Sequence, residues 1–221
     1  MMLGSYPQTF KEAFHDPRWQ ESMDEEYDSL HENKTWELVS LPPRRKLVQC
    51  KWIYNTKIDV DGTKTKYKAQ LVAKGYSQFQ GLDYNETFAP VARMDSIRLV
   101  LAVAASKRWE VHHMDVKSAF LHGDLKEYIY MKQPEGYIED PSLVCKLRKS
   151  LYGLKQDPRS WYSKMDAFLM SQKFGRCKSN CNVYMQKKDG SLLLIVLYVD
   201  DLLITSSSVS ILRSIKSSLN K

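Results

Sequence analysis

The sequence predicts an α+β fold built on antiparallel sheets, and three observations support this prediction. Strand-like segments come in pairs, and Asp-Gly turns join two of those pairs, at Asp61-Gly62 and at Asp189-Gly190. Helical segments separate the pairs, whereas a parallel fold would alternate single strands with single helices. No glycine-rich phosphate loop follows any expected strand, which argues against dinucleotide-binding folds and P-loop enzymes.

The N-terminal part of the chain is expected to run from helices into a hairpin. Residues 9–32 carry apolar side chains at helical spacing, and Pro17 is expected to start a second helix after a break. Residues 47–58 and 63–73 are predicted strands on either side of the first Asp-Gly turn.

The remaining elements alternate irregularly between helix and strand. Helices are predicted over residues 95–108, 157–173 and 208–219, and strands over residues 109–116, 127–132, 143–148, 182–188, 191–198 and 202–206. Asp95 or Ser96 is the expected N-cap of the first of these helices. Asp157 is the expected N-cap of the second, with Pro158 at its first position.

The composition is that of an ordinary globular protein, with 221 residues, 43% of them hydrophobic and 27% charged. No apolar run approaches the roughly 20 residues that cross a bilayer, and the start of the chain does not resemble a secretory signal. Cys177 and Cys181 have no second close pair to complete a zinc site, so the four cysteines are expected to be reduced thiols. We therefore expect an intracellular protein, in the cytoplasm or the nucleus, without membrane attachment.

The net charge of +7 is distributed unevenly along the chain. Residues 1–40 carry three basic and nine acidic side chains, whereas residues 41–80 carry nine basic side chains against two aspartates. A basic body favours a polyanionic partner such as nucleic acid. Solvated lysine faces are the alternative explanation.

Two adjacent carboxylates stand out in the stretch IVLYVDDLLIT, where Asp200 and Asp201 lie between two apolar strands. They are expected at the tip of a tight hairpin. Two half-buried neighbouring carboxylates repel each other, and a desolvated charge needs a partner. A bound metal ion would supply that partner, and a simple polar turn is the alternative, because Asp is common in turns.

A second apolar strand, in VHHMDVKSAF, also ends in a carboxylate, that of Asp115. If the two strands are neighbours in one sheet, Asp115 converges with Asp200 and Asp201. Three carboxylates suit a hard cation, Mg²⁺ or Mn²⁺. Two such ions can activate a hydroxyl nucleophile and stabilise the leaving oxygen of an in-line phosphoryl transfer.

The Tyr-Val-Asp-Asp hairpin resembles the catalytic motif of reverse transcriptases, and the other motifs resemble the Ty1/copia-type retrotransposon branch of that family. The matching stretches are WIYNTKIDVDGTKTKYKAQLVAKGYSQFQGLDYNETFAPVAR, MDVKSAFLHGDLKEYIYMKQPEGY, KLRKSLYGLKQDPRSWY and LYVDDLLIT. The resemblance covers roughly residues 9–221.

The resemblance implies a right-hand polymerase arrangement of fingers and palm, in which helices back an antiparallel palm sheet and the thumb is absent. It implies an N-terminal helical segment (1–40), fingers with a basic hairpin (41–93), and an incomplete palm with inserted fingers elements (94–221). The implied activity is that of an RNA-directed DNA polymerase using two Mg²⁺ or Mn²⁺ ions. The implied partners are an RNA or DNA template with its primer, dNTPs, and the thumb, RNase H and integrase domains of a full-length Pol polyprotein.

The resemblance also implies roles for single residues near the aspartates. Asp115 matches the first metal ligand of the family, Asp200 and Asp201 match the pair at the hairpin, and the Val116 carbonyl would be a further ligand. Phe120 matches the aromatic residue that crowds the sugar 2′ position and so favours deoxynucleotides. The alternative for Phe120 is a core aromatic residue.

Further residues are expected to contact the nucleotide or the template. Gln156 matches the glutamine that lies against the sugar of the incoming nucleotide; the alternative is an ordinary polar residue before a helix. Lys68 and Lys74 are the expected triphosphate contacts, and Lys64 and Lys66 are expected to contact nucleic acid. A solvated edge strand protected by lysines is the alternative for these four.

The chain departs from the family pattern at three positions and in its length. Gln70 replaces a common arginine, Asp157 replaces a small alanine, and Asn180 replaces an aspartate, but no metal ligand is lost. The chain also stops in the helix after Tyr-Val-Asp-Asp. The alternative function is therefore a truncated relic, catalytically weak or inactive, that binds nucleic acid only.

Overall fold

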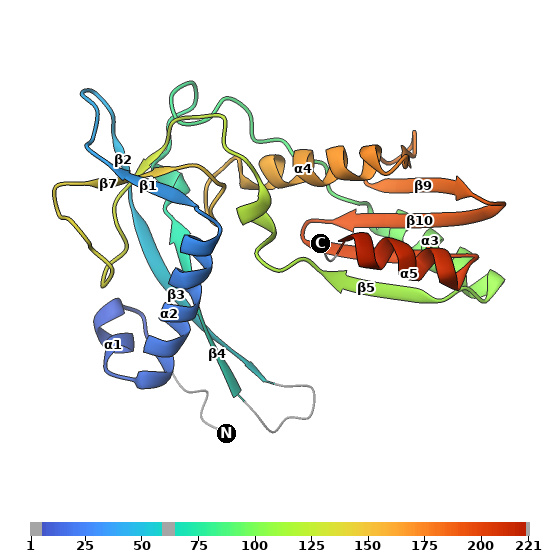
Figure 1. Ribbon diagram of the computed structural model, residues 1–221, viewed down its shortest axis with the longest axis horizontal. Helices are drawn as coiled ribbons and strands as arrows, with labels where there is room; N and C mark the ends of the chain where they lie inside the picture. The colour runs from blue at the N-terminus through green and yellow to red at the C-terminus, as the bar shows by residue number, and fades with distance from the viewer. Residues whose placement is uncertain (1–5, 59–64, 220–221) are drawn as a thin grey trace. The chain divides into compact units, whose positions relative to one another are not determined.

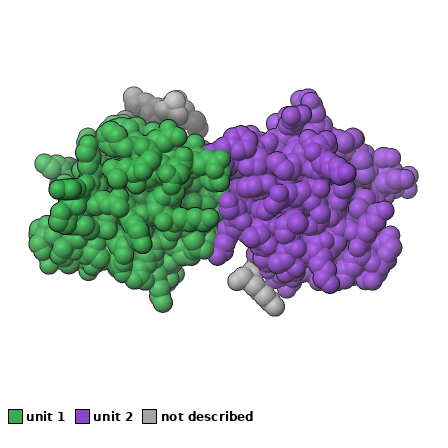
Figure 2. Space-filling model, turned by 90° about the horizontal axis from the view of Figure 1, so that it is seen from above, with its two compact units in different colours: residues 1–87, 120–161 green, residues 88–119, 162–221 purple. Residues whose placement is uncertain are grey.

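The computed structural model describes residues 6–58 and 65–219 and divides into two compact units, coloured in Figure 2. Unit 1 combines residues 1–87 with 120–161, and unit 2 combines residues 88–119 with 162–221. Helices and largely antiparallel sheets occur in both units, which confirms the predicted α+β class. The domain boundaries expected from the sequence do not coincide with the boundaries of these two units. The expected boundaries stay a prediction.

Unit 1 begins with two helices, α1 (Phe10–Phe14) and α2 (Pro17–Glu32) (Figure 1). The side chain of Asp16 caps α2 by accepting a hydrogen bond from the backbone N–H of Arg18. Pro17 occupies the first turn of α2, where its missing N–H is not needed, as predicted.

The core of unit 1 forms where α2 packs on a two-stranded antiparallel hairpin, β3 (Cys50–Ile58) and β4 (Thr65–Ala73). Trp19 of α2 makes edge contacts with the rings of Tyr54 and Tyr67, with ring centroids 5.3 and 4.6 Å apart. The Asp-Gly turn predicted between these strands lies outside the described residues.

A second sheet of unit 1 has the strand order β1-β7-β6-β2. Its strands are β1 (Trp36–Val39), β7 (Val144–Leu147), β6 (Tyr130–Met131) and β2 (Leu47–Val48). The pair β2–β6 is parallel and the other pairs are antiparallel. β6 is much shorter than the predicted strand 127–132.

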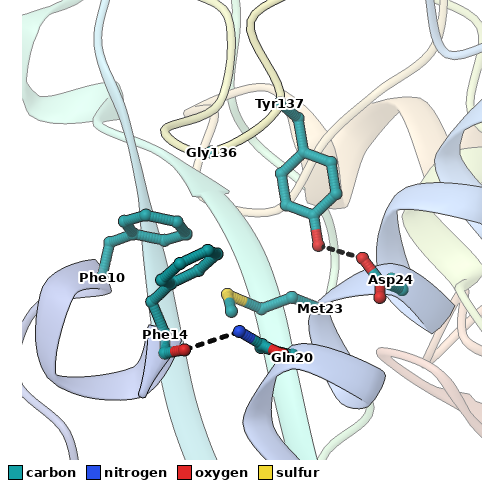
Figure 3. A pocket seen from close by; sticks show the side chains of 7 residues that line it. All are labelled: Phe10, Phe14, Gln20, Met23, Asp24, Gly136 and Tyr137. Carbon is teal, nitrogen blue, oxygen red and sulfur yellow. Dashed lines mark hydrogen bonds between the residues drawn. The ribbon is translucent and has the colours of Figure 1, made fainter. Parts of the chain in front are cut away.

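A pocket of about 240 Å³ lies in unit 1 among α1, α2 and the turn at Gly136 (Figure 3). The Tyr137 hydroxyl donates a hydrogen bond to Asp24 (2.6 Å) across this pocket. The ring of Phe10 covers Gly136 so closely that a Cβ there would lie 2.4 Å from a ring atom. None of the residues that line the pocket is a predicted site residue.

Unit 2 is built on a five-stranded antiparallel sheet of order β5-β11-β10-β9-β8. Its strands are β5 (Val111–Asp115), β11 (Asp201–Ser206), β10 (Ser191–Tyr198), β9 (Val183–Lys188) and β8 (Gly175–Arg176). β10 is the central strand and is buried from Leu193 to Leu197. Helix α5 (Val209–Leu219) packs on β11.

The turn between β9 and β10 was predicted correctly. Asp189 and Gly190 have φ angles of 49° and 74°, which is the pattern of a two-residue type I′ turn. The Asp-Gly pair tolerates these angles, and the turn fixes the register in which Ser191 faces Lys188.

The predicted cap of α3 (Met94–Lys107) is wrong. Arg93 is the N-cap and makes no side-chain capping bond, and Asp95 lies inside the first turn. The hydroxyl of Ser96 accepts a hydrogen bond from the side-chain amide of Asn180 (2.8 Å). Asn180 thereby ties α3 to the segment before β9, and an aspartate at this position could not donate that bond.

The predicted capping role of Asp157 is also wrong. Asp157 is the first residue of α4 (Asp157–Ser171), and its carboxylate accepts hydrogen bonds from the Ser150 hydroxyl and the Leu154 N–H. The side chain is 2% exposed. Desolvation raises the pKa of Asp157 to about 8, and the hydrogen bonds act against that rise.

All four cysteines are free thiols, as predicted. Burial raises the pKa of Cys50 to about 11 and that of Cys145 to about 12, so neither thiol is reactive near neutral pH. None of the helices in the described ranges is both long enough and apolar enough to span a bilayer.

Candidate active site

The hairpin between β10 and β11 carries the paired carboxylates. Tyr198 and Asp201 face each other as the last pair of the ladder, so Val199 and Asp200 form a two-residue turn. Val199 has a φ of 55°, a conformation that is an outlier for a β-branched residue. Such strain is retained only where the surrounding structure enforces it, and it is concentrated at functional sites.

The third carboxylate lies directly opposite this hairpin. In the antiparallel pair β5–β11, Asp115 is the register partner of Asp201. The backbone N–H of Val116 donates a hydrogen bond to the carbonyl of Asp200 (3.0 Å). Side chains of directly opposed residues lie on the same face of a sheet, about 4.5–5.5 Å apart at Cβ. The fold therefore brings the backbones of Asp115, Asp200 and Asp201 to one corner of the unit 2 sheet.

His113 is a member of this corner that the sequence reasoning missed. Its Nε2 lies 2.7 Å from Oδ1 of Asp201, and the two side chains are 67% and 43% exposed. His113 precedes Asp115 by two positions on β5, so both side chains are on the same face of the strand. The spacing of two residues between His113 and Asp115 was the signal in the sequence that could have identified His113.

The side chains of the described residues at this corner are not already arranged around a metal-binding position. Among the described residues, no group of three or more His, Cys, Asp or Glu side chains is arranged to hold a metal ion. One oxygen of Asp201 is instead engaged by His113. The backbone places the predicted ligands together, and their side chains would have to turn toward a shared ion.

Gln156, predicted to contact a nucleotide, is buried within unit 1 at 2% exposure. Its Oε1 accepts a hydrogen bond from Gln78 (3.0 Å), and its Nε2 donates one to the carbonyl of Asp83 (2.9 Å). Both ends of the amide are therefore engaged inside the unit. Phe120, predicted as a sugar gate, is half-buried and makes an edge contact with Tyr152, with ring centroids 4.7 Å apart.

The predicted phosphate-binding lysines differ in their surroundings. Lys66 and Lys68 are exposed on the same face of β4, and Lys74 is half-buried just after that strand. Burial raises the pKa of Glu26 in α2, while a hydrogen bond from the Leu71 N–H and the charge of Lys68 act in the opposite direction. Lys64 lies outside the described residues.

Comparison with known proteins agrees with the motifs. Residues 33–221 match the family described as reverse transcriptase (RNA-dependent DNA polymerase). The chain is 44% identical to the retrovirus-related Pol polyprotein from transposon TNT 1-94 of Nicotiana tabacum, over 97% of this chain and 17% of that protein. It is 42% identical to the Pol polyprotein from transposon RE1 of Arabidopsis thaliana, over 98% of this chain and 15% of that protein.

These relatives are copia-type Pol polyproteins, and the chain spans only about a sixth of their length. The family match covers most of the chain and includes β5, β11 and the turn before β11, which carry the three aspartates. The chain belongs to the reverse transcriptase (RNA-dependent DNA polymerase) family.

Proposed function

We propose that this chain is the RNA-directed DNA polymerase domain of a copia-type retrotransposon. The observation that supports the proposal most strongly is the pairing of Asp115 with Asp201 beside the strained turn at Asp200. This pairing brings residues that are far apart in the sequence to one corner of the unit 2 sheet. The chain also belongs to the reverse transcriptase family.

The donor set fits a hard divalent cation, because carboxylate and carbonyl oxygens are the ligands that Mg²⁺ prefers. Asp115, Asp200 and Asp201 would hold two ions, with the Val116 carbonyl as a further ligand. When bound, these ions would lower the pKa of a primer 3′-hydroxyl and neutralise the leaving pyrophosphate. His113 would orient Asp201 through Oδ1 and leave Oδ2 for an ion.

Residues of unit 1 would contact the substrates. In the proposed right-hand arrangement, the unit 2 sheet is the palm and the β3–β4 hairpin belongs to the fingers. Lys66, Lys68 and Lys74 would bind phosphates of the dNTP or the template through charge. Phe120 would exclude a 2′-hydroxyl, and Gln156 would support the nucleotide pocket from within the fold. The expected partners are a primed RNA or DNA template and the other domains of the polyprotein.

Primer extension on an RNA template tests this proposal. We expect the chain to extend a DNA primer with dNTPs and Mg²⁺, and Asp200→Asn to reduce extension at least about 100-fold, because loss of outer-shell partners alone costs 10–100-fold. Asp189→Asn is the matched control, since it removes a carboxylate from the other hairpin turn of β10 and asparagine tolerates a positive φ. Equal extension by Asp200→Asn and the unchanged chain would contradict the proposal.

A second candidate function is nucleic-acid binding without catalysis. It is favoured by the absence, among the described residues, of side chains already arranged to hold a metal ion. Gln70 in place of an arginine also removes a charge from β4. The two functions are separated by comparing this chain with one that carries the downstream region of its relatives. Extension by the longer chain alone would favour the binding function for this chain.

A further inference from the structure

A loop of unit 1, residues 74–84, is fixed in place by buried side chains. Gln78 is 5% exposed and donates a hydrogen bond from Nε2 to Gln156 Oε1 (3.0 Å). Its own Oε1 accepts one from the backbone N–H of Lys155 (2.8 Å). Gln156 in turn donates to the carbonyl of Asp83 (2.9 Å). This pair of glutamines holds the middle and the C-terminal end of the loop against the segment that leads into α4.

Backbone packing fixes the same loop a second time. A Cβ built on Gly75 would lie 2.0 Å from the carbonyl oxygen of Gly153, so the two backbones are in direct contact. The carboxylate of Asp83 accepts a hydrogen bond from the N–H of Phe79 (2.9 Å) and closes the turn between them. The loop is therefore preorganised, and little conformational entropy would be lost when it binds a partner.

This rigid loop presents large aromatic rings to solvent. Tyr76 is 79% exposed and Phe79 is 52% exposed. The ammonium of Lys46 lies 4.3 Å from the centroid of the Phe79 ring, and that of Lys155 lies 5.0 Å from the Tyr84 ring. In the described part of the chain, neither Lys46 nor the neighbouring Arg44 makes an ion pair with a carboxylate. The aromatic faces therefore lie beside positive charge that is not neutralised.

The combination of flat rings and unneutralised cations is selective for one class of partner. Unpaired bases offer π-faces that stack on aromatic side chains, and the strand that carries them is a polyanion. A duplex offers the charge but keeps its bases stacked inside, and an acidic peptide offers the charge without a series of π-faces.

We propose that Tyr76 and Phe79 form a stacking platform for unpaired bases of single-stranded nucleic acid, with Lys46 binding the phosphate backbone. The proposal rests on the proposed polymerase function in one respect, because the bound strand would then be the unpaired template. The binding itself needs neither dNTP nor metal ion.

Fluorescence anisotropy with a labelled oligouridylate tests the platform, in an Asp200→Asn background and without dNTP or Mg²⁺. We expect Tyr76→Ala and Phe79→Ala each to weaken binding about five- to tenfold, the lower part of the range for a base–aromatic stack. Tyr76→Phe keeps the ring and should restore the affinity. Binding of a blunt DNA duplex should stay unchanged in all these variants.

Tyr128→Ala is the matched control. Tyr128 is a 61% exposed tyrosine of the same unit with the Lys146 ammonium 5.6 Å from its ring, but Lys146 is paired with Glu37. We expect this variant to bind the oligouridylate like the unchanged chain. The platform is refuted if the loop variants bind it undiminished, which would point to a protein partner, or if they lose duplex binding equally. Failure of primer extension alone would leave the platform standing.

Discussion

The two turns that flank strand β10 have the same length but are built from different residues. Both are two-residue turns between antiparallel strands of one sheet. The β9–β10 turn uses Asp189 and Gly190, which adopt positive φ angles at little cost. The β10–β11 turn places Val199 at a φ of 55° and follows it with two carboxylates.

The two turns differ in how well their residues suit the backbone conformation they adopt. An L-residue in the left-handed region costs about 1–2 kcal/mol, and a β-branched side chain is among the least suited to it. The β10–β11 turn carries this cost together with the repulsion between Asp200 and Asp201. The β9–β10 turn carries neither, so the strain lies at the corner where Asp115 meets the hairpin.

The largest loss of stability is expected when the β9–β10 turn receives a valine, the residue that occupies the strained β10–β11 turn. Gly190→Val should lower the free energy of unfolding by about 1–2 kcal/mol. A Cβ at Gly190 meets nothing within 4 Å, so the expected loss comes from the positive φ and not from a clash at Cβ. Urea denaturation measures it, and an unchanged midpoint would show that a strained valine is not costly in this sheet.

The carboxylate of Asp157 in unit 1 is buried, whereas those of Asp200 and Asp201 in unit 2 are half-exposed. The folded pKa of Asp157 is raised to about 8, so its stabilising contribution is complete below its unfolded pKa near 4 and is lost as pH rises through 8. Asp157→Asn should raise the melting temperature at pH 8, by the equivalent of about 1–2 kcal/mol, and have little effect at pH 4. Thermal melts monitored by circular dichroism at both pH values test this, and an equal shift at the two pH values would contradict it.

The smallest effect is expected for the reverse exchange at the strained turn. Val199→Gly relieves the strain but adds conformational entropy to the unfolded chain, so a net gain of about 0.5–1 kcal/mol is expected. The same urea experiment measures it. A loss of stability would mean that packing of the Val199 side chain outweighs its backbone strain.

Local sequence signals predicted most elements and the general position of the carboxylates. The Asp189-Gly190 turn and Pro17 at the start of α2 depend on backbone preferences of single residues, and both were confirmed. The cap of α3 was predicted wrongly because the N-cap is Arg93, which makes no side-chain capping bond, whereas Ser96 bonds to Asn180, 84 positions away. The capping role of Asp157 was predicted wrongly because its carboxylate instead accepts hydrogen bonds from the Ser150 hydroxyl and from the Leu154 N–H in the loop before α4.

Long-range pairing also limits what the sequence reveals about the site. The proximity of Asp115 to the hairpin was a conditional expectation, since no local signal says which strand pairs with β11. The contact between His113 and Asp201 depends on that same pairing. The burial of Gln156 depends on Gln78 and Asp83, which lie more than 70 positions away and carry no recognisable local pattern.

The central claim is that Asp115, Asp200 and Asp201 share bound divalent ions, and Fe²⁺-directed backbone cleavage tests it most directly. Fe²⁺ bound in place of Mg²⁺ generates hydroxyl radicals that cut the nearest backbone in the presence of ascorbate and peroxide. We predict cuts both beside Asp115 and in the turn at Asp200, suppressed by excess Mg²⁺ and absent in Asp200→Asn. Cleavage at only one of these strands, or cleavage that persists in Asp200→Asn, would contradict the account.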